Sequence, residues 1–204
     1  MTGETIEYFY AAHSAYAYLG SRRFMEIAAA AGRKIVHRPY DLRLVLPAIG
    51  SPDFKSRTKP HYDYFFGREI QRWSEWRNAP VVGYTPTHHA NDIGLPNCVL
   101  IAGQEAGINI DELAHRMLES HWKEDSDLAD RETLMRLCDE VGIGGAPLLD
   151  AADSQEVRAI YDRYTEEAIA RSVFGSPTYF VDGDMFYGQD RLELVERALT
   201  KPFA

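Results

Sequence analysis

The chain has 204 residues, 45% hydrophobic and 26% charged, which is ordinary for one globular domain with an insertion or for two small domains. Its formal net charge of −9 argues against nucleic acid or an anionic membrane as the main partner, but it still allows a local site for a small anion. No apolar run approaches the ~18 residues of a membrane span, and no N-terminal run resembles a secretory signal, so we expect a cytoplasmic protein. Cys98 and Cys138 belong to no Cys-x-x-Cys pair, and we expect two buried free thiols.

The N-terminal part predicts a strand, a helix and a second strand. Residues 5–10 are rich in aromatic side chains, which suits a strand. Residues 15–31 carry apolar positions close to the 3.6-residue period and predict a helix that Gly32 ends. Residues 34–40 predict the second strand. Because the joints are short, we expect a βαβ unit with parallel strands.

From residue 41 to about 170 the sequence changes to helical segments and connections. Prolines and a glycine between residues 47 and 52 predict a loop. Five helices and one long surface connection follow, at 62–76, 97–106, 110–122, 131–141 and 154–171, with the connection at 79–96. Asp130 is expected to cap the fourth helix, which glycines at 142–145 end. Asp153 and Glu156 form a capping-box pattern at the start of the fifth.

The C-terminal part returns to strands. Residues 172–191 predict a turn, a strand, a two-residue Asp182-Gly183 hairpin, a second strand and the start of a helix at 190–199. With the helical block set aside, the element order β-α-β … β-β-α is that of a thioredoxin fold. We therefore predict an α/β, thioredoxin-like domain formed by residues 1–42 and 171–204, with an all-helical insertion domain at 43–170.

Pro177 lies directly before the apolar run of the third predicted strand, and two interpretations are open. An ordinary trans proline would open an edge strand. A cis bond would instead turn the backbone of Ser176 outward, leaving its N–H and C=O groups free to pair with an extended peptide.

In a thioredoxin fold the end of the first strand, the start of the first helix and the loop before the third strand meet. This places Ser14 at a helix N-terminus, which favours an anion, beside Ser176 and Pro177. Residues 14–17 (Ser-Ala-Tyr-Ala) contain no sulfur, so redox cycling through a local disulfide is excluded. Such a site could accept the thiol of glutathione, with the Ser14 hydroxyl donating to the thiolate; alternatively, Ser14 is a plain N-cap.

The stretch from Thr165 to Gly183, followed by Phe-Tyr-Gly-Gln-Asp-Arg-Leu at 186–192, resembles the 2-hydroxychromene-2-carboxylate isomerases and kappa-class glutathione transferases, in the DsbA-like branch of thioredoxin folds. The pattern Ser14-x-Tyr16-x-Tyr18-Leu19 also resembles this family. The resemblance implies a homodimeric enzyme of aromatic catabolism that uses glutathione. It implies that Ser14 contacts the glutathione sulfur and that the Ser176 backbone, beside Pro177, pairs with the cysteinyl part. It further implies that Gln189 and Asp190 hold the γ-glutamyl end.

The chain departs from the family pattern at several positions. Ala15 stands where the family has proline, Ser51 where it has asparagine, and Ser176 where it has an aliphatic residue. His13 replaces a small residue, and it is either a base or cation beside the thiolate or a loop histidine.

Other residues allow a functional and a plain interpretation. Adjacent His88 and His89 would point in opposite directions without suitably spaced partners, so no metal site is expected. Four cations are candidates for a substrate carboxylate or are simply solvated: Arg38, Arg43, Lys55 and Lys59. Six aromatic residues line an acceptor pocket or form the insertion's core: Tyr62, Tyr64, Phe65, Phe66, Trp73 and Trp76.

These features lead to a main hypothesis and its rivals. The first is a glutathione-dependent isomerase. Its substrate would be a small aromatic or conjugated acid, either a 2-hydroxychromene-2-carboxylate-like acid or a conjugated 2-oxo acid. The second is glutathione transfer to an electrophile, which differs in whether the adduct eliminates. The third is a non-catalytic module that binds an extended peptide at the proline loop. Disulfide oxidoreductase activity is disfavoured because the paired cysteines are absent.

Overall fold

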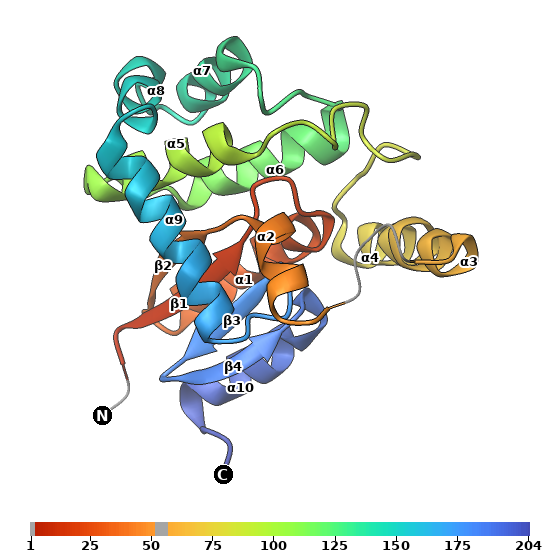
Figure 1. Ribbon diagram of the computed structural model, residues 1–204. Coiled ribbons are helices and arrows are strands. Elements are labelled where there is room, and N and C mark those ends of the chain that lie inside the picture. Colours follow the sequence, from red (N-terminus) through yellow and green to blue (C-terminus); the bar gives the residue numbers. More distant parts are fainter. Residues whose placement is uncertain (1–2, 52–56) are drawn as a thin grey trace.

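The computed structural model describes residues 3–51 and 57–204. Its centre is a mixed sheet with the strand order β2-β1-β3-β4 (Figure 1). The strands are β1 Thr5–Tyr10, β2 Lys34–Pro39, β3 Thr178–Val181 and β4 Asp184–Tyr187. β1 pairs with β2 in parallel and with β3 antiparallel, and β4 pairs antiparallel with β3. This topology confirms the predicted thioredoxin-like α/β fold and the parallel βαβ unit.

Alternating side chains of β1 serve the two faces of the sheet, as the pleat requires. Tyr8 packs against Phe24 of α1 (Ala15–Ala30), with 4.9 Å between ring centroids. Phe9 faces the other way, where the guanidinium of Arg171 lies 5.2 Å from its ring. Arg171 ends α9 (Gln155–Ala170), so the two faces are covered by helices from distant parts of the chain.

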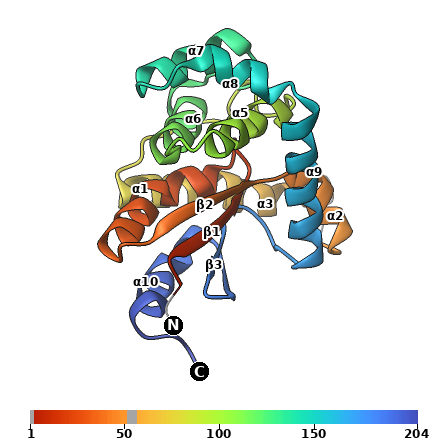
Figure 2. The same ribbon diagram turned by 90° about the vertical axis from the view of Figure 1, so that its left-hand side faces the viewer.

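The helical block between β2 and β3 has two parts. One comprises α5 Gly94–Glu105, α6 Asp111–Glu124, α7 Arg131–Glu140 and α8 Gly145–Ala152, which lie together above the sheet in both views (Figures 1 and 2). The other comprises α3 Lys59–Tyr62, the π-helical turn η2 Asp63–Arg68 and α4 Glu69–Arg77. We call these three the arm; it packs beside α1. α5 and α9 of the helical block pack directly on β2 of the sheet. The division into a thioredoxin-like domain and an insertion domain at 43–170 stays a prediction.

The chain ends at the opposite side of the sheet from the helical block (Figure 2). A short 3₁₀ turn, η3 Gln189–Arg191, leads from β4 into α10 Leu192–Thr200. Asp182 and Gly183 both have positive φ, 51° and 93°, which confirms the two-residue hairpin between β3 and β4. Buried Leu192, Val195 and Leu199 fasten α10 to the core.

The sequence argument missed two helices and misplaced one cap. The expected loop is present at residues 49–51, with Gly50 at a φ of 75°, but α2 Leu42–Ala48 precedes it, because the carboxylate of Asp41 accepts the N–H groups of Arg43 and Leu44. α7 ends before Gly142 as predicted, but α8 follows, and its eight residues are too few to show a periodic pattern. Ser154, rather than Asp153, caps α9 by accepting the N–H of Val157. Asp130 caps α7 as predicted.

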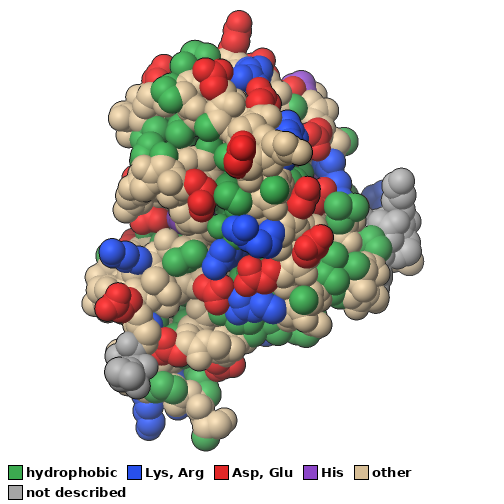
Figure 3. Space-filling view, turned by 60° about the vertical axis from the view of Figure 1, so that its left-hand side comes forward, with side chains coloured by type: hydrophobic (Ala, Val, Ile, Leu, Met, Phe, Trp, Pro, Cys, Tyr) green, Lys and Arg blue, Asp and Glu red, His purple; other side chains and the backbone are tan. Residues whose placement is uncertain are grey.

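Both cysteines are buried and free, as predicted, and burial raises the pKa of each thiol to about 11. Among the described residues, no helix is long and apolar enough to cross a membrane. On the face drawn in Figure 3, basic and acidic side chains are interspersed rather than gathered by sign. That face offers no broad positive surface to a polyanion.

Candidate active site

Ser14 joins the start of α1 to the loop before β3. Its Oγ accepts the N–H of Ala17 at 3.2 Å, which makes it the N-cap of α1. The same hydroxyl donates to the carbonyl of Ser176 at 3.0 Å. Because a hydroxyl has one proton, a bond from Ser14 to a thiolate requires this bond to be given up. The start of α1 and the proline loop are therefore in contact, as predicted. The Ser14 hydroxyl already donates its proton to the Ser176 carbonyl.

The loop before β3 contains a cis peptide bond between Ser176 and Pro177, so the cis interpretation is confirmed. The Ser176 carbonyl already accepts one hydrogen bond, from Ser14, and its pairing with an extended peptide stays a prediction. The Ser176 hydroxyl accepts the N–H of Ala11 at 3.0 Å, and the Pro177 carbonyl accepts the N–H of Gly188 at 2.9 Å. The proline loop is thus hydrogen-bonded to the end of β1 and to the turn before η3.

Gln189 and Asp190 follow this turn directly, and their side chains differ in burial and in hydrogen-bond partners. Gln189 is 1% exposed; its Oε1 lies 3.4 Å from Arg77 Nε, and its Nε2 is buried without a hydrogen-bond partner among the described residues. The Asp190 side chain is 42% exposed and pairs with Arg191. Of the predicted pair, only Asp190 offers its side chain to a ligand as the structure stands.

Two residues that the sequence argument missed hold the turn before Ser14. Asn97 is fully buried; its Oδ1 accepts the N–H of Ala12 at 3.0 Å. The indole N–H of Trp122 donates to the carbonyl of His13 at 2.8 Å. The signal for Asn97 is its position as a polar residue inside the apolar run Leu-Pro-Asn-Cys-Val-Leu-Ile. No local pattern indicates the role of Trp122, because its partner lies 109 positions away.

His13 is 7% exposed, and its ring lies against that of His89, with 4.7 Å between centroids. His13 does lie in a loop, as one of the two interpretations held, but it is buried rather than exposed. Burial lowers the pKa of His13 well below its ordinary value, and His89, His121 and Arg43 lower it further. This shift favours the neutral ring, and a catalytic role for His13 as a base stays a prediction.

Two tyrosines of α1 connect the Ser14 turn to the helical block. The hydroxyl of Tyr16 donates to the carbonyl of Phe65 in the arm at 2.5 Å. The hydroxyl of Tyr18 donates to the carbonyl of Pro80 at 3.0 Å, at the start of the connection between α4 and α5. Burial raises the pKa of Tyr16, and nearby Glu69 raises it further, so the phenol stays protonated and keeps its donor role.

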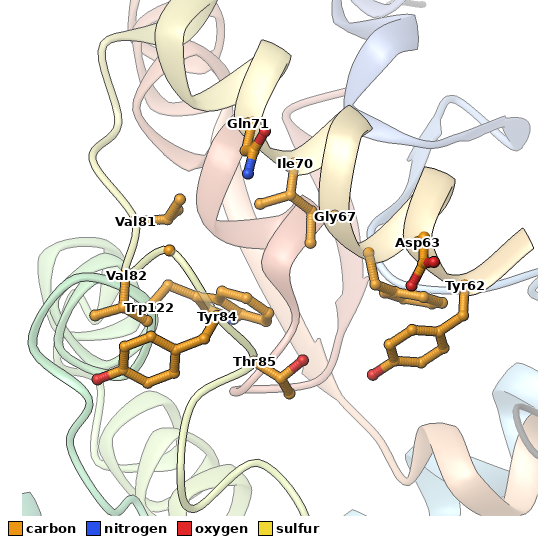
Figure 4. Close-up of a pocket in the computed structure, with 12 residues that line it drawn as sticks. Tyr62, Asp63, Gly67, Ile70, Gln71, Val81, Val82, Tyr84, Thr85 and Trp122 are labelled. Atoms are coloured by element: carbon orange, nitrogen blue, oxygen red, sulfur yellow. The ribbon is translucent and has the colours of Figure 1, made fainter. Parts of the chain in front are cut away.

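A cavity with a volume of about 200 Å³ lies between the arm and the connection that follows it. Tyr62 and Asp63 approach it from one side, and Tyr84 and Trp122 from the other (Figure 4). Its remaining lining is mostly apolar, with Phe66, Ile70, Val81 and Val82 beside Gln71 and Thr85. Because Trp122 both lines the cavity and donates to His13, the cavity adjoins the Ser14 turn. Of the six aromatic residues considered from sequence, Tyr62 and Phe66 line it.

The candidate carboxylate-binding cations have other contacts. Arg43 donates to the carbonyls of His89 and Asn91, both at 3.0 Å. Arg38 lies over the ring of Tyr164, with 4.7 Å to its centroid. Lys59 pairs with the carboxylate of Asp63 at 2.5 Å, at the rim of the cavity. Lys55 lies outside the described residues.

Arg57, which the sequence argument did not single out, lies two residues before the start of the arm. Its guanidinium lies 5.6 Å from the centroid of Phe66. Burial raises the pKa of Tyr187, and the charge of Arg57 opposes this rise. Tyr187 in turn packs on Gly175, where an added Cβ would lie 2.9 Å from its ring. The charge of Arg57 therefore influences the phenol of Tyr187, whose ring packs on Gly175 at the proline loop.

Within residues 3–51 and 57–204, no group of three or more His, Cys, Asp or Glu side chains is arranged to hold a metal ion. His88 has its Nδ1 3.5 Å from Asp127, whereas His89 hydrogen-bonds His121. The two adjacent histidines thus face different partners.

The whole chain is similar to proteins of known name. A 2-hydroxychromene-2-carboxylate isomerase of Pseudomonas putida is 28% identical over 200 residues, covering 96% of this chain and 94% of that protein. One of Pseudomonas sp. (strain C18) is 27% identical, covering 95% and 89%. A solved structure of a 2-hydroxychromene-2-carboxylate isomerase has a TM-score of 0.78 at 24% identity, covering 96% of this chain and 94% of that one. The model of the DSBA-like thioredoxin domain matches residues 5–200, and the chain belongs to that family.

Proposed function

We propose that the protein is a glutathione-dependent isomerase acting on an aromatic 2-hydroxychromene-2-carboxylate-like acid or a related conjugated 2-oxo acid. Two relatives named 2-hydroxychromene-2-carboxylate isomerase match the chain over nearly its full length, at 27% and 28% identity. One observation carries the proposal. Ser14, at the start of α1, is hydrogen-bonded to Ser176 beside the cis Pro177, in a segment that has no cysteine of its own.

The residues around the Ser14 turn fit an extended thiol peptide. Helical geometry leaves the first N–H groups of α1 without an intrahelical acceptor, and Ser14 satisfies that of Ala17. The remaining N–H groups and the helix dipole favour negative charge at this point. Asp190 is an exposed carboxylate suited to an α-ammonium group. Gln189 is enclosed at the same turn, where its Oε1 lies 3.4 Å from Arg77 Nε.

When bound, glutathione supplies a thiol nucleophile that adds reversibly to a conjugated carbon. The task of the Ser14 turn is to stabilise negative charge on sulfur, which lowers the pKa of a thiol and raises the share of the reactive form. The Ser14 hydroxyl moves its hydrogen bond from Ser176 to that charge. Neutral His13 adds no cation to the site, so stabilisation falls to the helix start and the hydroxyl.

The cavity beside Trp122 suits the aromatic ring of the substrate, because its walls are mainly aromatic and aliphatic. The Asp63 carboxylate at its edge disfavours an anion there, so we expect the substrate carboxylate to lie away from Asp63. Holding the substrate ring in the cavity would help to orient the bond that rotates.

Titration of glutathione, followed by thiolate ultraviolet absorbance across pH, tests the cofactor. We expect saturable binding and a bound thiol that ionises below its free pKa. Product analysis with a 2-hydroxychromene-2-carboxylate then tests the reaction: glutathione recovered unchanged supports isomerisation, whereas a stable conjugate identifies a transferase. If glutathione neither binds nor competes with an extended peptide that does bind, the protein is a binding module and the proposal fails.

The same proposal includes a homodimer, as the resemblance implies, and a cytoplasmic location, as expected from the sequence. Light scattering coupled to size-exclusion chromatography, over a range of protein concentrations, distinguishes a dimer from a 23.1 kDa monomer.

A further inference from the structure

Three histidines from separate segments form a cluster at the turn that carries Ser14. The ring of His13 packs against that of His89 at 4.7 Å and a 36° tilt. His89 and His121 stack with 5.3 Å between centroids, and His89 Nδ1 lies 3.0 Å from His121 Nε2. Trp122 packs edge-on against His89 at 5.3 Å. The cluster therefore joins α6, the 79–93 connection and the end of β1.

The hydrogen bonds determine the tautomers of the neutral pair. His121 Nδ1 lies 3.0 Å from the carbonyl of Ser126, which only accepts, so His121 carries its proton on Nδ1. Its Nε2 is then an acceptor, and His89 must donate from Nδ1. If His121 gains a proton, its Nε2 becomes a donor, and His89 must change to the other tautomer to accept from it. If His89 is then protonated as well, two N–H groups face each other across 3.0 Å.

The position of the His13 ring depends on packing. Its Nδ1 is buried without a hydrogen-bond partner among the described residues, so no polar contact of that atom fixes the ring. His89 provides the nearest ring contact, at 4.7 Å, and His121 lies farther away, at 6.4 Å. His89 is itself fixed by His121 and by the carbonyl of its own residue, which accepts from Arg43 at 3.0 Å.

The charged and titratable groups that face the cluster come from α2, from the 79–93 connection and from the segment after α6; they are Arg43, His88, Asp125 and Asp127. Burial lowers the pKa of His89 to about 4, with His121 and Arg43 lowering it further. Burial also lowers the pKa of His121, although Asp125 and Asp127 oppose this. The cluster is neutral at physiological pH.

We infer that His89 is a positioning residue for the site: locked in one tautomer by His121, it supports the His13 ring and so holds the turn that carries Ser14. The link from His13 to Ser14 is the backbone itself, fastened by the Trp122 indole at the His13 carbonyl. This role goes beyond the proposed reaction and does not depend on the identity of the cofactor.

The test follows two properties of the turn that do not involve glutathione. One is the protection of the Trp122 indole N–H against hydrogen exchange, which reports its bond to His13. The other is the pKa of the thiol introduced by Ser14→Cys, which reports the geometry of the helix start. Both are measured with His89→Gln, with His89→Phe, which keeps a ring, and with His115→Gln as control. His115 is a matched buried histidine because burial also lowers its pKa to about 4, and its Nδ1 bonds Ser21 at 2.7 Å.

We expect His89→Gln to reduce indole protection about tenfold and to raise the thiol pKa by about half a unit. His89→Phe should restore much of both, and His115→Gln should change neither. The inference is wrong if His89→Gln changes neither property, or if His115→Gln reproduces the same loss. Should His89→Gln fail to fold, ¹⁵N-histidine NMR of the unmutated protein decides: Nδ1–H on His89 and His121 supports the lock, and Nε2–H on His89 overturns it.

Discussion

The hydroxyl of Ser14 donates to the carbonyl of Ser176 across 3.0 Å, joining residues 162 positions apart. This bond closes the site, because it connects the start of α1 to the cis-proline loop. The same oxygen caps α1 by accepting from Ala17. Ser14 thus has two structural roles before any ligand arrives, and they can be separated by experiment.

Ser14→Ala should destabilise the protein more than Ser154→Ala. Ser154 caps α9 with the same 3.2 Å bond to the N–H three residues on, so it measures the loss of a cap alone, about 1 kcal/mol. Ser14→Ala also removes the bond to Ser176, for a total of about 2 kcal/mol. Urea unfolding measures both. We further expect a loss of glutathione affinity of about tenfold in Ser14→Ala only; equal affinities in the two variants would contradict the assigned site.

Ser14→Cys should yield a thiol with a pKa below the ordinary value of about 8.5, because it lies at the N-terminus of α1. The pH dependence of alkylation by iodoacetamide measures it. Native Cys98 and Cys138 make little background, since burial raises the pKa of each to about 11. A pKa at or above the ordinary value would show that the helix start does not favour an anion.

Asn97→Ala should cost about 1–3 kcal/mol of the free energy of unfolding, because it leaves the buried N–H of Ala12 without its acceptor. Asn91→Ala is the control: this exposed amide bonds Asp127 at 2.9 Å on the surface. Its loss should change stability by no more than about 0.5 kcal/mol. If both variants unfold at the same urea concentration, Asn97 does not hold the turn.

Trp122→Phe should weaken the site while preserving an aromatic wall in the cavity. It removes the indole N–H that bonds the His13 carbonyl, leaving a buried acceptor unpaired. We expect a lower kcat/KM with the proposed substrate, by about tenfold, together with a modest loss of stability. Trp76→Phe, at a side chain 78% exposed, should leave both unchanged; a similar effect there would count against a specific role.

Stability should fall as the pH drops from about 6.5 to about 4. Burial lowers the pKa of His89 and His115 to about 4 in the folded protein, whereas unfolded histidine titrates near 6.5. Between these values the unfolded chain binds more protons, so each group contributes a slope of at most about 1.4 kcal/mol per pH unit, with full stability above the window. His115→Gln should make the slope shallower in urea unfolding at several pH values; an unchanged slope would show that His115 does not titrate in this way.

Local chemistry in the sequence determined much of the fold. The aromatic run of β1, the periodic apolar positions of α1 and the Asp182-Gly183 turn each depend on neighbouring residues, and each was found where the sequence predicts it. The absence of cysteine from residues 14–17 likewise excludes a local disulfide whatever the fold. Topology then follows from element order, which is why Ser14 could be placed beside Pro177.

The tertiary structure alone decided what surrounds that site. Asn97, Trp122 and His89 reach the Ser14 turn from segments far away in the chain, and no local pattern relates such pairs. Burial decided that Gln189 is enclosed and that His13 is neutral. Hydrogen bonds and pKa values of this kind depend on which groups packing brings together and on how much water it removes, and neither quantity is a property of neighbouring residues.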